Sequence, residues 1–201
     1  SPFFSLSIRF AIVAVGFLLF SFLKGDSIII NFKRIFEAGV SGILFHGLYL
    51  GGVFYSISIG LPASISALIV SMQPILTNIF AGPILNEKVT WKQWIGILLG
   101  FIGTIIVLGY DIGTNIPIIG IIASIVSLIA ATTGTLYQKK LSGTLPLTVS
   151  NFYQATSASI FLFIIMFFFE NHFLSLTFEF VLAMSWQILA VSFGAFTILM
   201  Y

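Results

Sequence analysis

Long apolar runs dominate this sequence and limit it to very few folds. Six of them approach the roughly twenty residues with which a helix crosses a bilayer, and a seventh ends with the chain. In chain order they cover Pro2–Leu23, Ser41–Ile59, Pro62–Leu85, Gln93–Tyr110, Ile116–Tyr137, Leu147–Phe169 and Leu182–Tyr201. Lipid offers the backbone no hydrogen-bond partner, and the alternating pattern of a barrel strand is absent. Each run is therefore predicted to be a helix.

The composition leads to the same class. Hydrophobic residues make up 59% of the chain and charged residues 7%, with a mean hydropathy of +1.16, whereas soluble domains carry about 25% charged residues. We predict an all-α, polytopic membrane helix bundle. There is no cysteine, which excludes disulfides and thiolate sites. The net charge of +2 gives no reason to expect nucleic acid as a partner.

The basic residues predict the orientation in the membrane. Seven of them lie in alternate loops: Lys24, Lys33, Arg34, Lys88, Lys92, Lys139 and Lys140. The intervening loops, at 60–61, 111–115 and 170–181, contain no lysine or arginine. Cytoplasmic loops are the basic ones, so the first run is expected to enter from outside, after a further span that precedes this sequence. The expected location is the cell membrane, specifically the bacterial inner membrane.

Two other classes of membrane protein remain as alternatives. A seven-helix receptor would share the external N-terminus, but the last run has no lysine for a retinal Schiff base and no cysteine is present to clamp external loops. For an integral-membrane enzyme, the sequence offers no acid pair, metal-ligand cluster or glycine-rich phosphate loop. We therefore expect no catalytic residue, cofactor or metal.

An internal repeat of opposite topology explains the organisation better. Pro2 begins the first run and Pro146 precedes the sixth, and each of these runs leads through a loop to a helix that contains glycine and tyrosine. The corresponding runs cross the membrane in opposite directions, as in the inverted repeats of many transporters.

The third run contains Gln73 and Pro74 near its centre. Proline removes a backbone hydrogen bond and is expected to kink the helix, either for packing or to open a polar cavity. Gln73 shares one helical face with Ser66, Val70 and Thr77. A glutamine at this depth is expected to face protein, water or substrate.

Other polar residues inside the runs are candidates for a central site. His46 and Tyr49 share a face of the second run, where His46 either packs or couples transport to protons. Arg9 in the first run either extends to the membrane surface or contacts an anionic group. Asn151 and Gln154 form a polar face near the start of the sixth run.

The turn after the third run and the glycines of the fourth are structural candidates. Glu87 is a lone acid in that turn, and Thr90 with Gln93 has the spacing of a capping box. Gly96, Gly100 and Gly103 recur along the fourth run, and the first two form GxxxG. This pattern is typical of close helix packing, either within the chain or in a homodimer.

Residues 73–109 carry a family resemblance. A helix with QP at its middle, a lone acid, a turn with tryptophan and glutamine, and GILLGFIGTIIVLG resemble the close of the first EamA-type repeat in the drug/metabolite transporter superfamily. The residues that carry the resemblance are Pro74, Glu87, Thr90, Gln93, Gly96 and Gly103, and Pro2 with Arg9 is similar to the start of that repeat's second helix. The resemblance implies ten helices in two inverted repeats of five. Residues 1–110 would then be the first repeat without its first helix, and residues 111–201 the start of the second.

The resemblance implies a secondary transporter of small organic metabolites, amino acids or drugs that works by alternating access. We expect substrate contacts from Arg9, His46, Tyr49, Gln73, Asn151 and Gln154, and structural roles for Pro74, Glu87, Gly96, Gly100 and Gly103. The expected partners are a small-molecule substrate, the lipid bilayer, coupled protons and a second copy of the chain.

Overall fold

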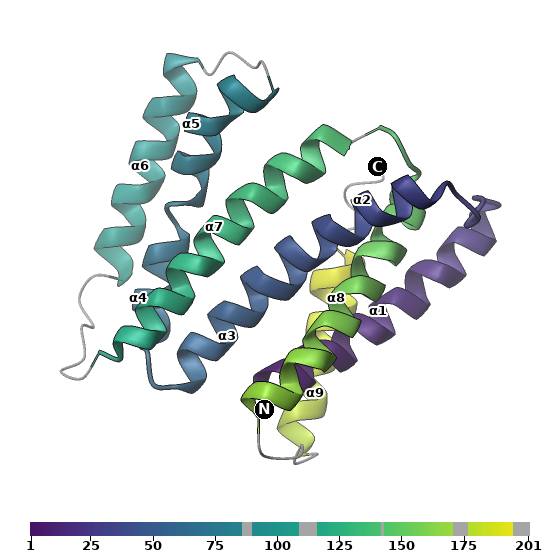
Figure 1. Ribbon diagram of the computed structural model, residues 1–201. Helices are drawn as coiled ribbons and strands as arrows, with labels where there is room; N and C mark the ends of the chain where they lie inside the picture. Colours follow the sequence, from purple (N-terminus) through teal and green to yellow (C-terminus); the bar gives the residue numbers. More distant parts are fainter. Residues whose placement is uncertain (86–89, 109–115, 142, 171–176, 195–201) are drawn as a thin grey trace. The chain divides into compact units, whose positions relative to one another are not determined.

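A computed structural model describes residues 1–85, 90–108, 116–141, 143–170 and 177–194. Their regular structure is entirely helical, and η marks a π-helical segment (Figure 1). In chain order the elements are α1 (Pro2–Lys24), α2 (Phe32–Gly42), η1 (Ile43–Leu50), α3 (Gly51–Ser58), α4 (Ala63–Val70), α5 (Gln73–Leu85), α6 (Trp91–Leu108), α7 (Ile118–Leu141), α8 (Leu147–Phe169), α9 (Phe178–Trp186) and η2 (Gln187–Gly194).

The predicted all-α, multi-pass class is confirmed. Among the described residues, five helical segments are long and apolar enough to cross a membrane: Pro2–Lys24, Phe32–Ser58, Ala63–Leu85, Ile118–Leu141 and Leu147–Phe169. Two shorter apolar helices cover Trp91–Ile106 and Phe178–Gly194. The second span begins at Phe32, earlier than the predicted Ser41, because Asn31 caps the helix by accepting a 3.1 Å hydrogen bond from the Lys33 backbone N–H.

The third span is interrupted where a kink was predicted. α4 ends at Val70 and α5 begins at Gln73. At the interruption the Met72 N–H donates to the Ile69 carbonyl over 3.2 Å, a tighter turn than that of an α-helix. Pro74 is the second residue of the new helix, a position where its missing N–H costs no hydrogen bond.

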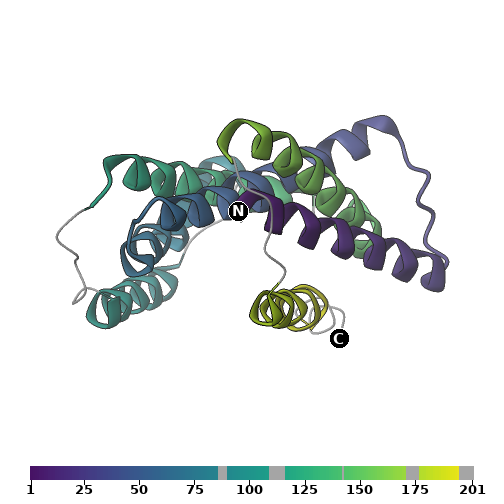
Figure 2. The same cartoon turned by 90° about the horizontal axis from the view of Figure 1, so that it is seen from below.

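The helices form two compact units. Unit 1 comprises residues 1–43 and the described part of 143–201, and unit 2 the described part of 44–142. In unit 1, α8 packs against α1 and α2, and η2 contacts α1 (Figure 2). In unit 2, α7 packs against α3, α4 and α5, and α6 lies beside α4 and α5. Contacts define these units, whereas recurrence of sequence defines the predicted repeats 1–110 and 111–201.

Backbones approach closely in unit 1. A Cβ atom added to Gly42 would lie 2.2 Å from the Gln154 carbonyl oxygen, so α2 meets α8 at a position that only glycine fits. The Ser7 hydroxyl donates to the Ser159 carbonyl at 3.0 Å, and the Ser159 hydroxyl donates to the Ser7 carbonyl at 2.9 Å. This reciprocal pair connects α1 to α8.

The carboxylate of Glu170, at the end of α8, makes a second connection between α8 and α1. It accepts hydrogen bonds from the backbone N–H groups of Phe3 at 2.6 Å and Phe4 at 3.2 Å. Both donors belong to the first turn of α1, where backbone N–H groups have no partner within the helix and where negative charge is favoured. The end of α8 thus caps the start of α1.

A chain of hydroxyls holds unit 2 together. Ser66 Oγ lies 3.2 Å from Ser56 Oγ and 3.0 Å from Ser124 Oγ, which connects α4 to α3 and to α7. All three side chains are fully buried. Gly52 supports the same contact, because a Cβ atom there would lie 2.2 Å from Ser127 Oγ.

The two π-helical segments recur at a spacing that the predicted repeat would require. From Pro2 to Pro146, from Ile43 to Gln187 and from Leu50 to Gly194 the separation is 144 residues. A π-helical turn interrupts regular α-helical hydrogen bonding and occurs often at functional sites. The repeat itself stays a prediction, and this recurrence supports it.

Candidate functional site: a cavity in unit 2

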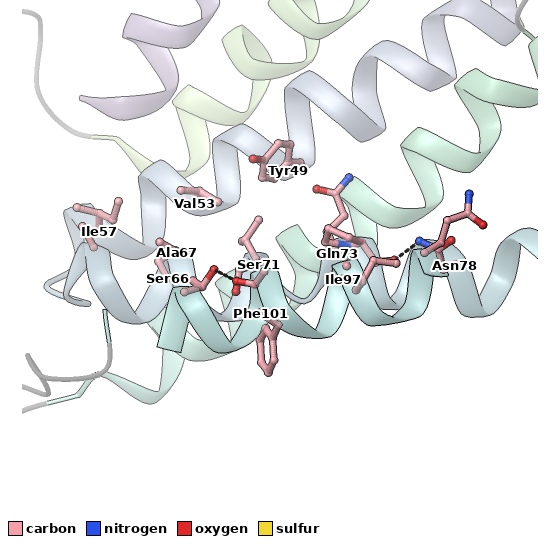
Figure 3. A pocket seen from close by; sticks show the side chains of 17 residues that line it. Tyr49, Val53, Ile57, Ser66, Ala67, Ser71, Gln73, Asn78, Ile97 and Phe101 are labelled. Atoms are coloured by element: carbon pink, nitrogen blue, oxygen red, sulfur yellow. Dashed lines mark hydrogen bonds between the residues drawn. The ribbon is translucent and has the colours of Figure 1, made fainter. Parts of the chain in front are cut away.

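A cavity of about 1060 Å³ lies in unit 2, between the second span, the interrupted third span and α6 (Figure 3). Pockets for drug-sized molecules occupy about 300–1,000 Å³, so this one is large enough for a small organic solute. Its described lining residues are Tyr49, Val53, Ile57, Ala63, Ser66, Ala67, Val70, Ser71, Gln73, Pro74, Asn78, Gln93, Gly96, Ile97, Gly100, Phe101 and Thr104.

Gln73 is the polar residue whose orientation the structure fixes best. Its Nε2 donates to Thr135 Oγ1 at 2.9 Å and to the Ala131 carbonyl at 3.5 Å, both on α7. A carbonyl only accepts hydrogen bonds, so Nε2 faces α7 and Oε1 faces the other way. Figure 3 shows the Gln73 side chain extending toward the side of the cavity that Tyr49 occupies.

Tyr49 reaches the cavity from η1. Its ring packs against Phe45, with ring centroids 5.5 Å apart. The hydroxyl has no hydrogen-bond partner among the described residues. Tyr49 and Gln73 therefore present an O–H donor and a carbonyl acceptor to one cavity.

Two further amides line the cavity with part of their hydrogen-bonding capacity committed. Asn78 Nδ2 donates to the Pro74 carbonyl at 2.8 Å. Gln93 Oε1 accepts from the Thr90 N–H at 2.7 Å and from Thr90 Oγ1 at 2.9 Å, while the Gln93 N–H donates to Thr90 Oγ1 at 3.4 Å. This is the predicted capping box, which starts α6 at Trp91.

Three hydroxyl residues, Ser66, Ser71 and Thr104, also line the cavity. The rest of the lining is apolar, and none of the described lining residues carries a formal charge. Val53, Ile57, Val70 and Ile97 supply branched aliphatic surface. Within the part of the chain that the structure describes, no group of three histidine or acidic side chains is placed to hold a metal ion. The site can thus contact a solute by apolar packing and neutral hydrogen bonds.

Two of the three predicted structural glycines of α6 line this cavity. Gly96 and Gly100 face it, and Gly103 lies outside its lining. Apart from the neighbouring residues and backbone of α6 itself, no described atom lies within 4 Å of a Cβ atom added to any of the three. Close packing of another described helix on this glycine face is therefore not observed, and its role in a homodimer stays a prediction.

The predicted contacts of unit 1 lie among packed helices. Arg9 is 7% exposed, and its guanidinium donates to Gln187 Oε1 at 3.1 Å and to Ser192 Oγ at 3.3 Å. It bonds within the unit rather than extending to its surface. Gln154 is buried and donates to Ser150 Oγ at 2.9 Å, and Asn151 on the same helix is half-buried.

Of the six predicted substrate contacts, the structure brings Tyr49 and Gln73 to one cavity. His46 lies one turn before Tyr49 in η1 and packs its ring edge-on against Phe45, with centroids 5.3 Å apart. It does not line the cavity. Arg9, Asn151 and Gln154 belong to unit 1, and Glu87 lies outside the described residues.

The polar stripe predicted for the third span is only partly continuous. Ser66, Val70 and Gln73 line the cavity, whereas Asn78 takes the place expected for Thr77. Thr77 Oγ1 is buried. The cavity face continues in four-residue steps from Val70 through Pro74 to Asn78. The predicted stripe took a three-residue step from Val70 to Gln73 and so reached Thr77 instead. Gln73-Pro74 marked the interruption in the sequence, and a face extended from Pro74 in place of Gln73 would have included Asn78.

Comparisons with known proteins identify the class. The EamA-like transporter family model matches residues 1–109, which is more than half of the chain. The chain therefore belongs to the EamA-like transporter family, and it is a multi-pass membrane protein.

Two curated relatives carry names of the same kind. The chain is 32% identical over 128 residues to "Uncharacterized transporter YvbV" of Bacillus subtilis (strain 168), covering 64% of this chain and 40% of the relative. It is 26% identical over 143 residues to an "Uncharacterized transporter" of Archaeoglobus fulgidus, covering 70% of this chain and 49% of the relative. The matches thus span less than half the length of these curated relatives. No solved structure matches the chain.

Proposed function

We propose that the protein is a secondary transporter that moves small organic metabolites, amino acids or drugs across the bacterial cytoplasmic membrane by alternating access. The observation that carries the proposal is the interrupted third span, which places Gln73 against a large cavity with its carbonyl turned away from α7. Interrupted membrane helices at solute sites are a recurring feature of secondary transporters. Transport rather than catalysis also fits the family to which the chain belongs.

The orientation belongs to the same proposal. With Lys24, Lys33 and Arg34 in the cytoplasm, α1 enters from the outside and ends at the inner surface. His46 is the candidate for proton coupling, because a histidine titrates near neutral pH and lies next to the cavity-lining segment of η1.

The test of transport compares cells with and without the complete gene. A panel of toxic amino-acid analogues, organic acids and dyes is applied, and the inhibitory concentration of each compound is measured. At least one compound should shift its inhibitory concentration, and the uptake or export of that compound is then followed with a radiolabel. If no compound in a broad panel distinguishes the two strains, the proposal loses its support.

The role of Gln73 is tested by Gln73→Leu in that transport assay. Removing the amide takes away a hydrogen-bonding group and leaves a substrate group unpaired, which costs about 1–2 kcal/mol and should slow transport roughly tenfold.

Thr135→Val is the matched control. It removes the α7 hydroxyl that holds Gln73 Nε2 but changes no residue of the cavity lining. One interhelical hydrogen bond of this kind contributes about 0.6 kcal/mol, so transport should fall by less than roughly threefold. Equal losses in both variants would mean that Gln73 acts only by packing against α7.

A further inference from the structure

We infer that the cavity of unit 2 binds an uncharged, mainly apolar organic solute whose hydrogen-bonding group lies between Tyr49 and Gln73. The inference rests on the proposed transport function and names the class of substrate for the same site. It is carried by three properties of the lining: the absence of charge among its described residues, the hydroxyl donor of Tyr49 together with the carbonyl acceptor of Gln73, and the aliphatic walls.

The uncharged lining disfavours ionised solutes. An ionised solute that leaves water must recover its lost hydration from opposite charges or from many hydrogen bonds. The described lining residues offer no lysine, arginine, aspartate, glutamate or histidine. Arg9, the buried cation of the described chain, belongs to unit 1 and bonds to Gln187 and Ser192. A carboxylate or an ammonium group would therefore bind here much more weakly than its neutral counterpart.

Tyr49 and Gln73 define the polar end of the solute. Tyr49 can donate through its hydroxyl, and Gln73 can accept through Oε1 because its Nε2 is committed to α7. A primary or secondary amide carries both a carbonyl acceptor and an N–H donor and so satisfies this pair without a formal charge.

The apolar lining residues define the apolar end of the solute. Val53, Ile57 and Ile97 present branched side chains, and Gly96 and Gly100 leave room beside them. A ring or a branched aliphatic group would gain stabilisation by leaving water at this surface.

Three matched naphthalene probes test the inference by direct binding. They are 1-naphthaleneacetamide, 1-naphthaleneacetate and 2-(1-naphthyl)ethylamine, which at pH 7 are neutral, anionic and cationic around the same ring. Binding to the purified protein in detergent is measured by equilibrium dialysis with fluorescence readout. The amide should bind at least roughly tenfold more tightly than either ion.

Two glycine variants of α6 locate the binding. Gly100→Leu places a side chain in the open space of the cavity, and Gly103→Leu places the same side chain on the same helix outside the lining. Both exchanges raise helix propensity similarly, so folding is matched. Gly100→Leu should weaken amide binding at least roughly tenfold, and Gly103→Leu should change it less than about twofold.

The inference is overturned if either ion binds as tightly as the amide, if the amide shows no saturable binding, or if Gly100→Leu leaves amide binding unchanged. These measurements are independent of transport. If cells show transport but the probes show no preference for the amide, the substrate class is wrong and the proposed function stands. If the probes bind as expected but no compound is transported, the proposed function fails.

Discussion

Units 1 and 2 both contain polar side chains inside apolar helices, but they accommodate these side chains differently. In unit 1 the polar groups are buried among tightly packed helices. Some are paired, as in the reciprocal bonds of Ser7 with Ser159 and the two bonds of Arg9, and others, such as Gln154 Oε1, have no partner among the described residues. In unit 2 one hydroxyl cluster is paired in this way, but Tyr49 and Gln73 keep hydrogen-bonding capacity that faces a cavity.

This difference distinguishes polar residues that stabilise the fold from polar residues that can contact a solute. A polar group buried between helices is out of reach of a solute, whereas one that lines a cavity can exchange its bonds with water for bonds to a ligand. The contrast predicts that substitutions in unit 1 act mainly on stability. Substitutions of the cavity-facing groups in unit 2 should act mainly on binding and transport.

The largest expected effect is that of Gly42→Leu in unit 1. Three backbone atoms of Gln154 lie within 2.7 Å of an added Cβ, so α2 and α8 must separate. Overpacking of this kind should destabilise the protein on the order of 3 kcal/mol, measured as the free energy of unfolding in mixed micelles. Gly39→Ala is the control, because its Cβ would meet Ser157 at an ordinary 3.6 Å. Wild-type stability of Gly42→Leu would contradict the tight packing of unit 1.

A smaller effect is expected for Ser66→Ala in unit 2. The substitution removes hydrogen bonds to Ser56 and Ser124 and leaves two buried hydroxyls less well paired. The expected loss is about 1 kcal/mol in the same unfolding measurement. Ser71→Ala is the matched control, since Ser71 also lines the cavity but bonds only to the Leu68 carbonyl of its own helix. If both variants lost the same stability, the cluster would have no special role in holding α3, α4 and α7 together.

The smallest effect is expected for Glu170→Gln. The neutral amide can still accept a hydrogen bond from the first turn of α1 but loses the attraction between the carboxylate and the helix N-terminus. The expected cost is about 0.5 kcal/mol, read as a lower melting temperature in detergent. Glu179→Gln is the comparison, because Glu179 is exposed in the first turn of α9. An unchanged melting temperature for Glu170→Gln would show that the cap contributes no charge-dependent stability.

Part of the site was predictable because its signals are local in the sequence. Gln73-Pro74 marked the interruption of the third span, and the spacing of Thr90 and Gln93 predicted the cap of α6. The position of Asn78 was not predicted, because the predicted face continued from Gln73 to Thr77 and not from Pro74 to Asn78. The early start of the second span was also missed, since α2 is amphipathic and does not belong to the apolar run.

The sequence by itself determined the membrane class, the helices and the approximate spans, because lipid forces every backbone group into a local hydrogen bond and apolar length alone marks such segments. Only the tertiary structure decided which polar residues face a cavity and which are buried between helices. Gln73 and Gln154 are alike in sequence, each a glutamine within an apolar helix, yet Gln73 lines a cavity and Gln154 is buried against α2. The physical reason is that burial depends on which backbone lies a few ångströms away, and the neighbour comes from a distant part of the chain.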